Sequence, residues 1–224
     1  MRINYRISIK FILFNFINLL VLSSNCQTVK STIIGSNCWM AENLNVDKFR
    51  NGDDITQAKS NEEWKKACEN KQPAWCYYAN DSQIGEKYGK LYNWYAVIDS
   101  RGLAPEGWHV ATIEEWGAMR DFLGEPGKYG VGAGNKMRSR KDWSLLSGNN
   151  ESGFTALPGM CRYYYVVSNQ VKIGFGEKKC AQWWCVGNIK NSRTADYCRL
   201  GETGDLFFYR ENKEWGLSVR CVKN

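Results

Sequence analysis

The run GWHVATIEEW at positions 107–116 most constrains what this chain can fold into. A short apolar segment ends at Thr112, and Glu115 follows three residues later. In such a pair the Thr hydroxyl accepts a hydrogen bond from the Glu amide, and the Glu carboxylate accepts one from the Thr amide, so the pattern starts a helix. Apolar residues then recur at helical spacing at Trp116, Met119 and Leu123. We therefore expect a strand that leads directly into a helix with one apolar face.

The remaining apolar pattern predicts a mixed fold. A second capping box at Ser60 and Glu63 predicts a helix over about 61–69, and apolar spacing predicts another near 88–97. Short apolar runs bounded by Gly, Asn and Asp predict strands, at 32–34, 38–41, 162–167, 181–186, 195–200, 206–210 and 216–222. The last two are expected to form a closing hairpin. Because helices gather in the first half and strands in the second, we expect an α+β fold of short helices on small, largely antiparallel sheets.

Between these elements the chain has a glycine-rich stretch over 124–150. Its Gly130, Gly132 and Gly134 resemble a phosphate-binding loop, but such a loop follows a strand and opens a helix, whereas here a helix is expected to precede it. We expect a plain loop. The following segment, 152–159, is expected to be a short buried strand and turn.

Residues 1–25 have the composition of an export signal. Three basic residues precede an apolar run over 11–22, which is shorter than the roughly 20 residues of a membrane-spanning helix. The sequence Leu-Ser-Ser-Asn then precedes Cys26, as in a loose lipobox, so we expect cleavage before Cys26 and lipidation of its thiol. Ordinary cleavage without a lipid is the alternative. We expect a lipoprotein signal peptide at 1–25, a short tether at 26–31 and one domain at 32–224, on the outer membrane or cell surface; the alternative location is periplasmic or secreted.

Eight further cysteines support an oxidising compartment, since an even number in an exported chain indicates disulfides. Eight cysteines allow 105 pairings, and Cys68 with Cys76 is the first pair to expect because Pro73 between them favours a chain reversal. A zinc site is disfavoured, because no Cys-x2-Cys occurs and the only histidine is distant in sequence. We expect no metal, no cofactor, and disulfides among Cys38, Cys68, Cys76, Cys161, Cys180, Cys185, Cys198 and Cys221.

The charge does not indicate nucleic-acid binding. The whole chain carries +7, and removing the three basic residues of the leader leaves +4. Lysine and arginine are scattered, without a basic helix or a nucleic-acid motif. Aromatic residues make up 14% of the chain, enough to pack beneath long irregular segments and to offer rings for stacking a sugar.

Several blocks, in order, resemble one family. They are Ile34-Gly35 with Trp39 to Leu44; Tyr88 to Ala96; Gly107 to Val110 with Thr112, Glu115 and Trp116; Gly134 with Lys136 and Met137; Ser152 to Phe154 with Ala156 to Gly159 and Arg162; Trp183-Trp184; and Gly216 to Val222. Together they resemble the Fibrobacter succinogenes major paralogous domain, found in exported proteins and lipoproteins of Bacteroidetes-type bacteria. The family pattern is in turn similar to the formylglycine-generating-enzyme branch of the C-type lectin fold. That resemblance implies a C-type-lectin-like, loop-rich and disulfide-stapled domain, in which the N-terminal hairpin and C-terminal strand lie together and the middle is looped out as a binding surface.

The first functional hypothesis is a non-catalytic binding module of the cell envelope, with an unknown glycan or protein ligand. Candidate ligand-binding residues are Tyr163, Tyr164, Tyr165 and Trp184. Neighbouring strand residues face opposite sides, so at least one of Trp183 and Trp184 is expected to be buried. Calcium is not indicated, since the Glu-Pro-Asn and Trp-Asn-Asp patterns of calcium-dependent lectins do not occur.

Two alternatives stay open. A formylglycine-generating-type oxidoreductase uses paired thiols that bind copper, and Cys180, Cys185 and Cys198 are the candidates for it. A purely structural envelope protein is the other. The single histidine, His109, lies beside a helix start and lacks an evident orienting partner, so we expect a structural role for it.

Overall fold

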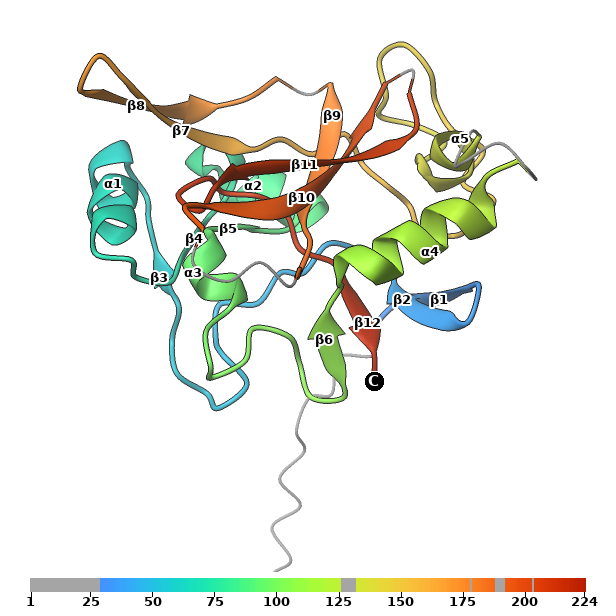
Figure 1. The fold of residues 1–224 in the computed structure, drawn as a ribbon, viewed down its shortest axis with the longest axis horizontal. Coiled ribbons are helices and arrows are strands. Elements are labelled where there is room, and N and C mark those ends of the chain that lie inside the picture. The colour runs from blue at the N-terminus through green and yellow to red at the C-terminus, as the bar shows by residue number, and fades with distance from the viewer. Residues whose placement is uncertain (1–28, 126–131, 178, 188–191, 203) are drawn as a thin grey trace, which may run out of the picture.

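The computed structural model describes residues 29–125, 132–177, 179–187, 192–202 and 204–224. The predicted signal peptide and Cys26 lie outside the described residues. Figure 1 shows short helices around several small sheets, which confirms the α+β class. In chain order the elements are β1 (Ser31–Ile34), β2 (Asn37–Met40), β3 (Thr56–Gln57), α1 (Asn61–Glu69), β4 (Ala74–Cys76), the 3-10 turn η1 (Tyr78–Asn80), α2 (Ser82–Tyr88), β5 (Leu91–Tyr92), α3 (Trp94–Val97), β6 (Trp108–Val110), α4 (Ile113–Leu123), α5 (Ala133–Met137), β7 (Arg162–Val167), β8 (Gln170–Phe175), β9 (Cys180–Trp184), β10 (Thr194–Gly201), β11 (Leu206–Asn212) and β12 (Cys221–Lys223).

One sheet joins the two ends of the described chain. Its strand order is β1-β2-β12-β6, and β12 pairs antiparallel with β2 on one side and β6 on the other. The predicted β1–β2 hairpin is confirmed, with Gly35 at φ +62° in its turn. The N-terminal hairpin and the C-terminal strand therefore lie together, as the resemblance implied. Among the described residues, no helix has both the length and the apolar character needed to cross a membrane.

The predicted closing hairpin is wrong. Strand β11 pairs with β10, from Thr194 opposite Asn212 to Leu200 opposite Leu206. The residues after β11 are held by three distant segments, through bridges of Gly216 to Arg162, Leu217 to Tyr92 and Ser218 to Trp183. Local spacing cannot predict these long-range pairings. Because of them, the chain leaves β11 before β12 begins and forms no hairpin with it.

Both predicted capping boxes start helices, but only one closes reciprocally. At α4 the Thr112 hydroxyl accepts from the Glu115 amide, and Glu115 Oε2 accepts from the Thr112 amide at 2.8 Å. At α1 Ser60 accepts from the Glu63 amide, whereas the Glu63 carboxylate accepts from the amide of Lys59. Local hydrogen bonding thus fixes where both helices begin, as expected from the sequence.

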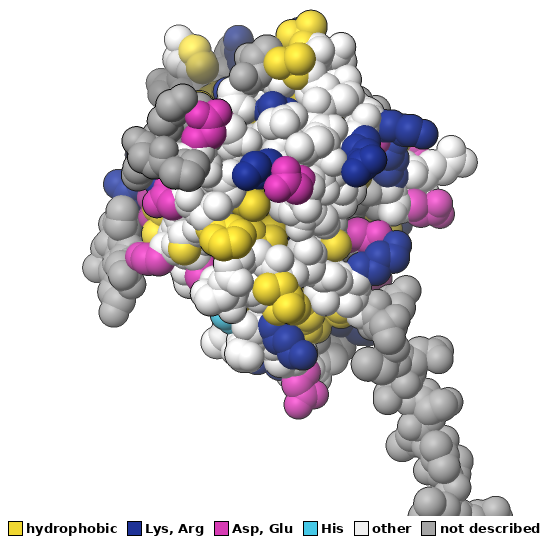
Figure 2. All heavy atoms as spheres, turned by 90° about the vertical axis from the view of Figure 1, so that its right-hand side faces the viewer, with side chains coloured by type: hydrophobic (Ala, Val, Ile, Leu, Met, Phe, Trp, Pro, Cys, Tyr) yellow, Lys and Arg dark blue, Asp and Glu magenta, His cyan; other side chains and the backbone are white. Residues whose placement is uncertain are grey.

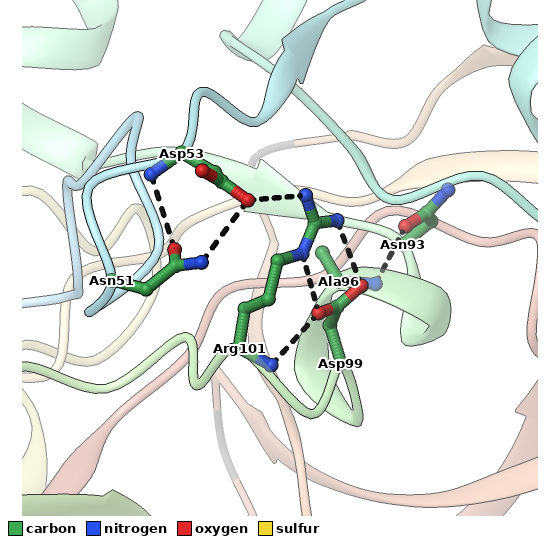
Figure 3. A network of polar contacts seen from close by, with 6 residues as sticks. All are labelled: Asn51, Asp53, Asn93, Ala96, Asp99 and Arg101. Carbon is green, nitrogen blue, oxygen red and sulfur yellow. Dashed lines mark hydrogen bonds and ion pairs between the residues drawn. The ribbon is translucent and has the colours of Figure 1, made fainter.

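The predicted helix near 88–97 is wrong, because two shorter helices and a strand occupy this region. Helix α2 ends before Gly89, which adopts φ +76°, a conformation that glycine adopts without strain. Asn93 then starts α3, since its side-chain oxygen accepts from the Ala96 amide at 3.1 Å. Figure 3 also shows Arg101 beyond α3, where it pairs with Asp99 and Asp53.

The second half forms a two-stranded hairpin and a separate three-stranded sheet. Strands β7 and β8 pair from Arg162 opposite Phe175 to Val167 opposite Gln170, and the hairpin projects from the body in Figure 1. Strand β8 was not predicted from the sequence. The sheet of order β11-β10-β9 contains the predicted strands near 181–186, 195–200 and 206–210.

This sheet separates two hydrophobic cores. Trp184, Ala195 and Tyr197 belong to the core that also holds Trp64, Trp75 and Tyr92. Trp183, Cys185, Cys198 and Leu200 belong to the other, with Trp39, Trp116 and Phe154. Because successive strand residues point to opposite faces, β9 and β10 are apolar on both sides.

Two further segments complete the second core. The predicted strand over 152–159 is wrong: only an isolated bridge of Arg138 to Ala156 forms there, although Phe154 is fully buried as expected. The plain loop predicted for the glycine-rich stretch is wrong in part, because Gly132 caps helix α5, which contains Gly134. The amides of Gly132 and Gly134 both donate to Asp205 Oδ1 at 3.0 Å, while Gly130 lies outside the described residues. The amides that resemble a phosphate loop are thus bound by a carboxylate of the chain itself.

Candidate ligand-binding site

The β7–β8 hairpin carries the predicted tyrosines. Its turn is formed by Ser168 and Asn169, both with positive φ (50° and 61°), the conformation of a tight two-residue hairpin turn. Near the tip, Val166 and Val167 are 64% and 50% exposed. An exposed apolar tip on a two-stranded hairpin marks this element as a candidate contact surface.

The three tyrosines point in alternating directions. The rings of Tyr163 and Tyr165 stack at 5.5 Å between centroids, and Tyr165 is 41% exposed. Tyr164 faces the other way and is largely buried. Trp184 is fully buried, its Nε1 donates to the Tyr92 carbonyl at 2.8 Å, and its ring lies edge-on to Trp94. Trp184 therefore lies in the core and not on a ligand surface.

A cleft of about 430 Å³ lies beside Tyr164. It is bounded by the end of α1, helix α3, the hairpin and the segment after β11, and it is lined by Cys68, Glu69, Lys71, Tyr95, Tyr164, Val166, Arg193, Asn212 and Glu214. The sequence had singled out only Tyr164 as a ligand residue here. The others come from segments far apart in sequence, so no local motif could have identified them together.

Glu214 organises the polar side of this cleft. Its Oε1 accepts from the Tyr95 hydroxyl at 3.0 Å, and its backbone carbonyl accepts from Trp64 Nε1 at 2.9 Å. The thiol of Cys68 also donates to that carbonyl at 3.5 Å. Burial, followed by the Glu214 carboxylate, raises the pKa of Tyr95 above its ordinary value. Tyr95 is thus held as a neutral hydrogen-bond donor to Glu214.

Two cations of the cleft have no acidic partner among the residues that the structure describes. Within the described chain, Lys71 and Arg193 form no ion pair, whereas Glu69 pairs with Lys65 at 3.7 Å. A cleft that combines two unpaired cations, a tyrosine hydroxyl and an aromatic ring suits a polar ligand that carries an acidic group.

Hydrogen bonds of Arg162 hold the base of the hairpin against the start of α1. Arg162, at the base of the hairpin, is fully buried and donates to the Ser60 carbonyl at 2.7 Å and to Asn61 Oδ1 at 2.8 Å, both at the start of α1. A second, more open cleft of about 810 Å³ lies between α1 and the hairpin and includes Tyr163 and Lys172. The hairpin therefore separates two clefts, and Arg162 fixes its base.

The other residues nominated from the sequence lie elsewhere. All eight described cysteines are free thiols in the structure, so the disulfide framework, including Cys68 with Cys76, stays a prediction. His109 contacts Glu115 Oε1 through Nε2 at 2.8 Å and Asn224 Oδ1 through Nδ1 at 2.7 Å, which links β6 to the start of α4 and suits a structural role. In the described part of the chain, no group of three His, Cys, Asp or Glu side chains is placed to hold a metal ion.

Figure 2 shows another face of the molecule, on which side chains of both charge signs are mixed. Its exposed apolar side chains stand among both acidic and basic ones. The mixed signs leave no basic stripe of the kind that nucleic acids require on the part of this face that is described.

The described residues form an α+β fold with paired end strands and a long middle segment that carries a polar aromatic cleft. Residues 33–223 match the family described as the Fibrobacter succinogenes major domain (Fib_succ_major), and the chain belongs to this family. No curated protein and no solved structure matches the chain. The further likeness to the C-type lectin fold and to formylglycine-generating enzymes therefore stays a prediction.

Proposed function

We propose that this protein is an exported binding module of the cell envelope, anchored through a lipid on Cys26, which holds a glycan with an acidic group in the cleft beside Tyr164. The observation that supports this proposal is the combination of the unpaired Lys71 and Arg193 with the Tyr95–Glu214 hydrogen bond in one open cleft. Sugar hydroxyls both donate and accept, so Glu214 and Tyr95 suit them, while the two cations suit a carboxylate or sulfate.

The proposed role is non-catalytic. A general acid–base pair needs groups whose pKa values suit proton transfer near neutral pH. In this cleft the pKa of Tyr95 is raised above its ordinary value, and burial raises the pKa of the Cys68 thiol to about 12. Both groups stay protonated near neutral pH and serve as hydrogen-bond donors. A peptide ligand and a purely structural role are the alternatives that the binding experiment distinguishes.

The test is a screen of neutral and acidic glycans against the mature protein, followed by calorimetry on the best ligand. Replacing Lys71 or Arg193 by Gln should weaken binding of an acidic glycan about tenfold, because each change removes a charge-assisted hydrogen bond. The matched control is Lys141→Gln, which removes an exposed lysine from a loop that does not line the cleft. Equal affinity for all three variants would contradict the site, and binding of peptides alone would contradict the ligand class.

Export and anchoring have their own test. Cells that express the full chain are labelled with palmitate, and the protein is recovered and compared with Cys26→Ala. We expect the label to be lost in the variant. Unchanged labelling would contradict the anchor while leaving the proposed cleft untouched.

A further inference from the structure

Cys185 and Cys198 lie side by side across two paired strands. Cys198 is opposite Trp183 in the β9–β10 register, and the Cys185 amide donates to the Asp196 carbonyl at 2.9 Å. Cys185 is two residues from Trp183, so its side chain projects from the same face of the sheet as Cys198. The two cysteines are therefore diagonal neighbours on one face of the paired strands.

Their surroundings leave the two sulfurs few other partners. Both residues are fully buried in the second core, with Trp183 and Leu200. Within the described chain, the Cys185 thiol donates to the Trp183 carbonyl at 3.6 Å. Cys68, by contrast, donates to the Glu214 carbonyl at the edge of the cleft. Cys185 and Cys198 thus lie together inside the second core, on one face of one sheet.

We propose that Cys185 and Cys198 are joined by a disulfide in the exported protein, which crosslinks the residue after β9 to strand β10. The oxidant is a disulfide donor of the export compartment, either a protein disulfide or a small-molecule disulfide. One cysteine thiolate attacks a donor sulfur and forms a mixed disulfide; the other thiolate displaces the second donor thiolate. Two protons leave the cysteines, two electrons pass to the donor, and the donor is released as two thiols.

The crosslink is expected to form before the sheet is buried. In the finished fold both sulfurs are inaccessible, so a donor can reach them only while β9 and β10 are still assembling. Once closed, the bond limits the separation of these strands in the unfolded chain, which stabilises the fold. This inference does not depend on the ligand proposed above.

The test maps disulfides in protein recovered from the export compartment. Free thiols are blocked in denaturant without reductant, and the chain is digested. Trypsin leaves Cys180 and Cys185 on one peptide, because no Lys or Arg lies between them; chymotrypsin, which cuts after tryptophan, separates them at Trp183 and Trp184. We expect a Cys185–Cys198 crosslinked peptide in the wild type and in Cys180→Ser, and no such peptide from protein made in a reducing compartment.

Two results would overturn the proposal. One is blocking of both Cys185 and Cys198 before any reduction. The other is a crosslink of either residue to a different cysteine. If both thiols are free and the native protein binds one equivalent of copper(I) in a competition titration, the result also favours the oxidoreductase alternative. Loss of glycan binding with an intact crosslink would count only against the proposed ligand.

Discussion

Trp183 and Trp184 are neighbours on β9, yet each is fully buried in a different hydrophobic core. Trp183 donates from Nε1 to Asn43 Oδ1 at 2.9 Å, and Trp184 donates to the Tyr92 carbonyl at 2.8 Å. One dipeptide therefore ties the three-stranded sheet to structure on both of its sides.

We predict that Trp183→Phe and Trp184→Phe each lower the free energy of unfolding by about 1–3 kcal/mol, because each removes an indole hydrogen bond and replaces a fully buried ring by a smaller one. Since the two rings lie in separate cores, the double variant should lose the sum of the single losses to within about 0.5 kcal/mol. Urea unfolding measures all three, with the exposed Tyr209→Phe as control. A strongly non-additive double variant would show that the cores are coupled.

Features that depend on residues close together in the chain could be predicted from the sequence, whereas long-range contacts could not. Helix starts at Thr112 and Ser60 depend on residues three positions apart, and both were predicted. The strand partners of Gly216 and Val222 lie far away in the chain, and so do the residues that join Tyr164 in its cleft. Local sequence patterns do not indicate such contacts. Trp184 was assigned to a ligand surface because aromatic character alone does not distinguish a core ring from a stacking platform.

Asn93 is a fully buried amide whose hydrogen-bonding groups are used. Its Oδ1 accepts from the amides of Ala74 and Ala96, and its Nδ2 donates to the Gln72 carbonyl at 2.8 Å. We predict that Asn93→Ala lowers the free energy of unfolding by about 2–4 kcal/mol, because it removes the α3 cap and leaves buried groups unpaired. The surface change Asn51→Ala, in the network of Figure 3, should cost well under about 1 kcal/mol. Thermal unfolding of the two variants checks the order.

The reduced protein should lose stability in alkaline solution. Burial raises the pKa of the Cys76 thiol to about 11, while an unfolded thiol titrates near 8.5. The raised folded pKa means that this contribution is complete below about pH 8.5 and is lost as the pH rises toward 11. For Cys76 alone the loss is about 1.4 kcal/mol per pH unit inside that window.

Urea unfolding at pH 8, 9.5 and 10.5, in the presence of a phosphine reductant, measures this loss. Cys76→Ala lacks the titrating thiol, so its stability should fall less steeply than that of the wild type, and the gap between the two proteins should narrow as the pH rises. Parallel curves would show that the Cys76 thiol ionises as readily in the folded protein as in the unfolded chain.

The ring of Tyr77 occupies the space that a Cβ atom at Gly85 in α2 would need. A Cβ built there would lie 2.0 Å from Cδ1 of Tyr77 and 2.8 Å from its Cγ, and the Tyr77 ring packs edge-on against Trp75 at 5.0 Å. The ring cannot move aside without losing that contact. We predict that Gly85→Ala lowers the free energy of unfolding by about 1–3 kcal/mol, although alanine favours a helix by about 1 kcal/mol over glycine.

The matched control is Gly117→Ala in α4, where a Cβ meets no atom within 4 Å, so the same substitution should raise stability by up to about 1 kcal/mol. Shortening the obstructing ring provides the second check. In the background of Tyr77→Ala, the cost of Gly85→Ala should fall by at least about 1 kcal/mol, because the overlap is gone while the helix preference stays. If Gly85→Ala costs the same with and without the tyrosine ring, the penalty arises from the α2 backbone and not from the contact with Tyr77.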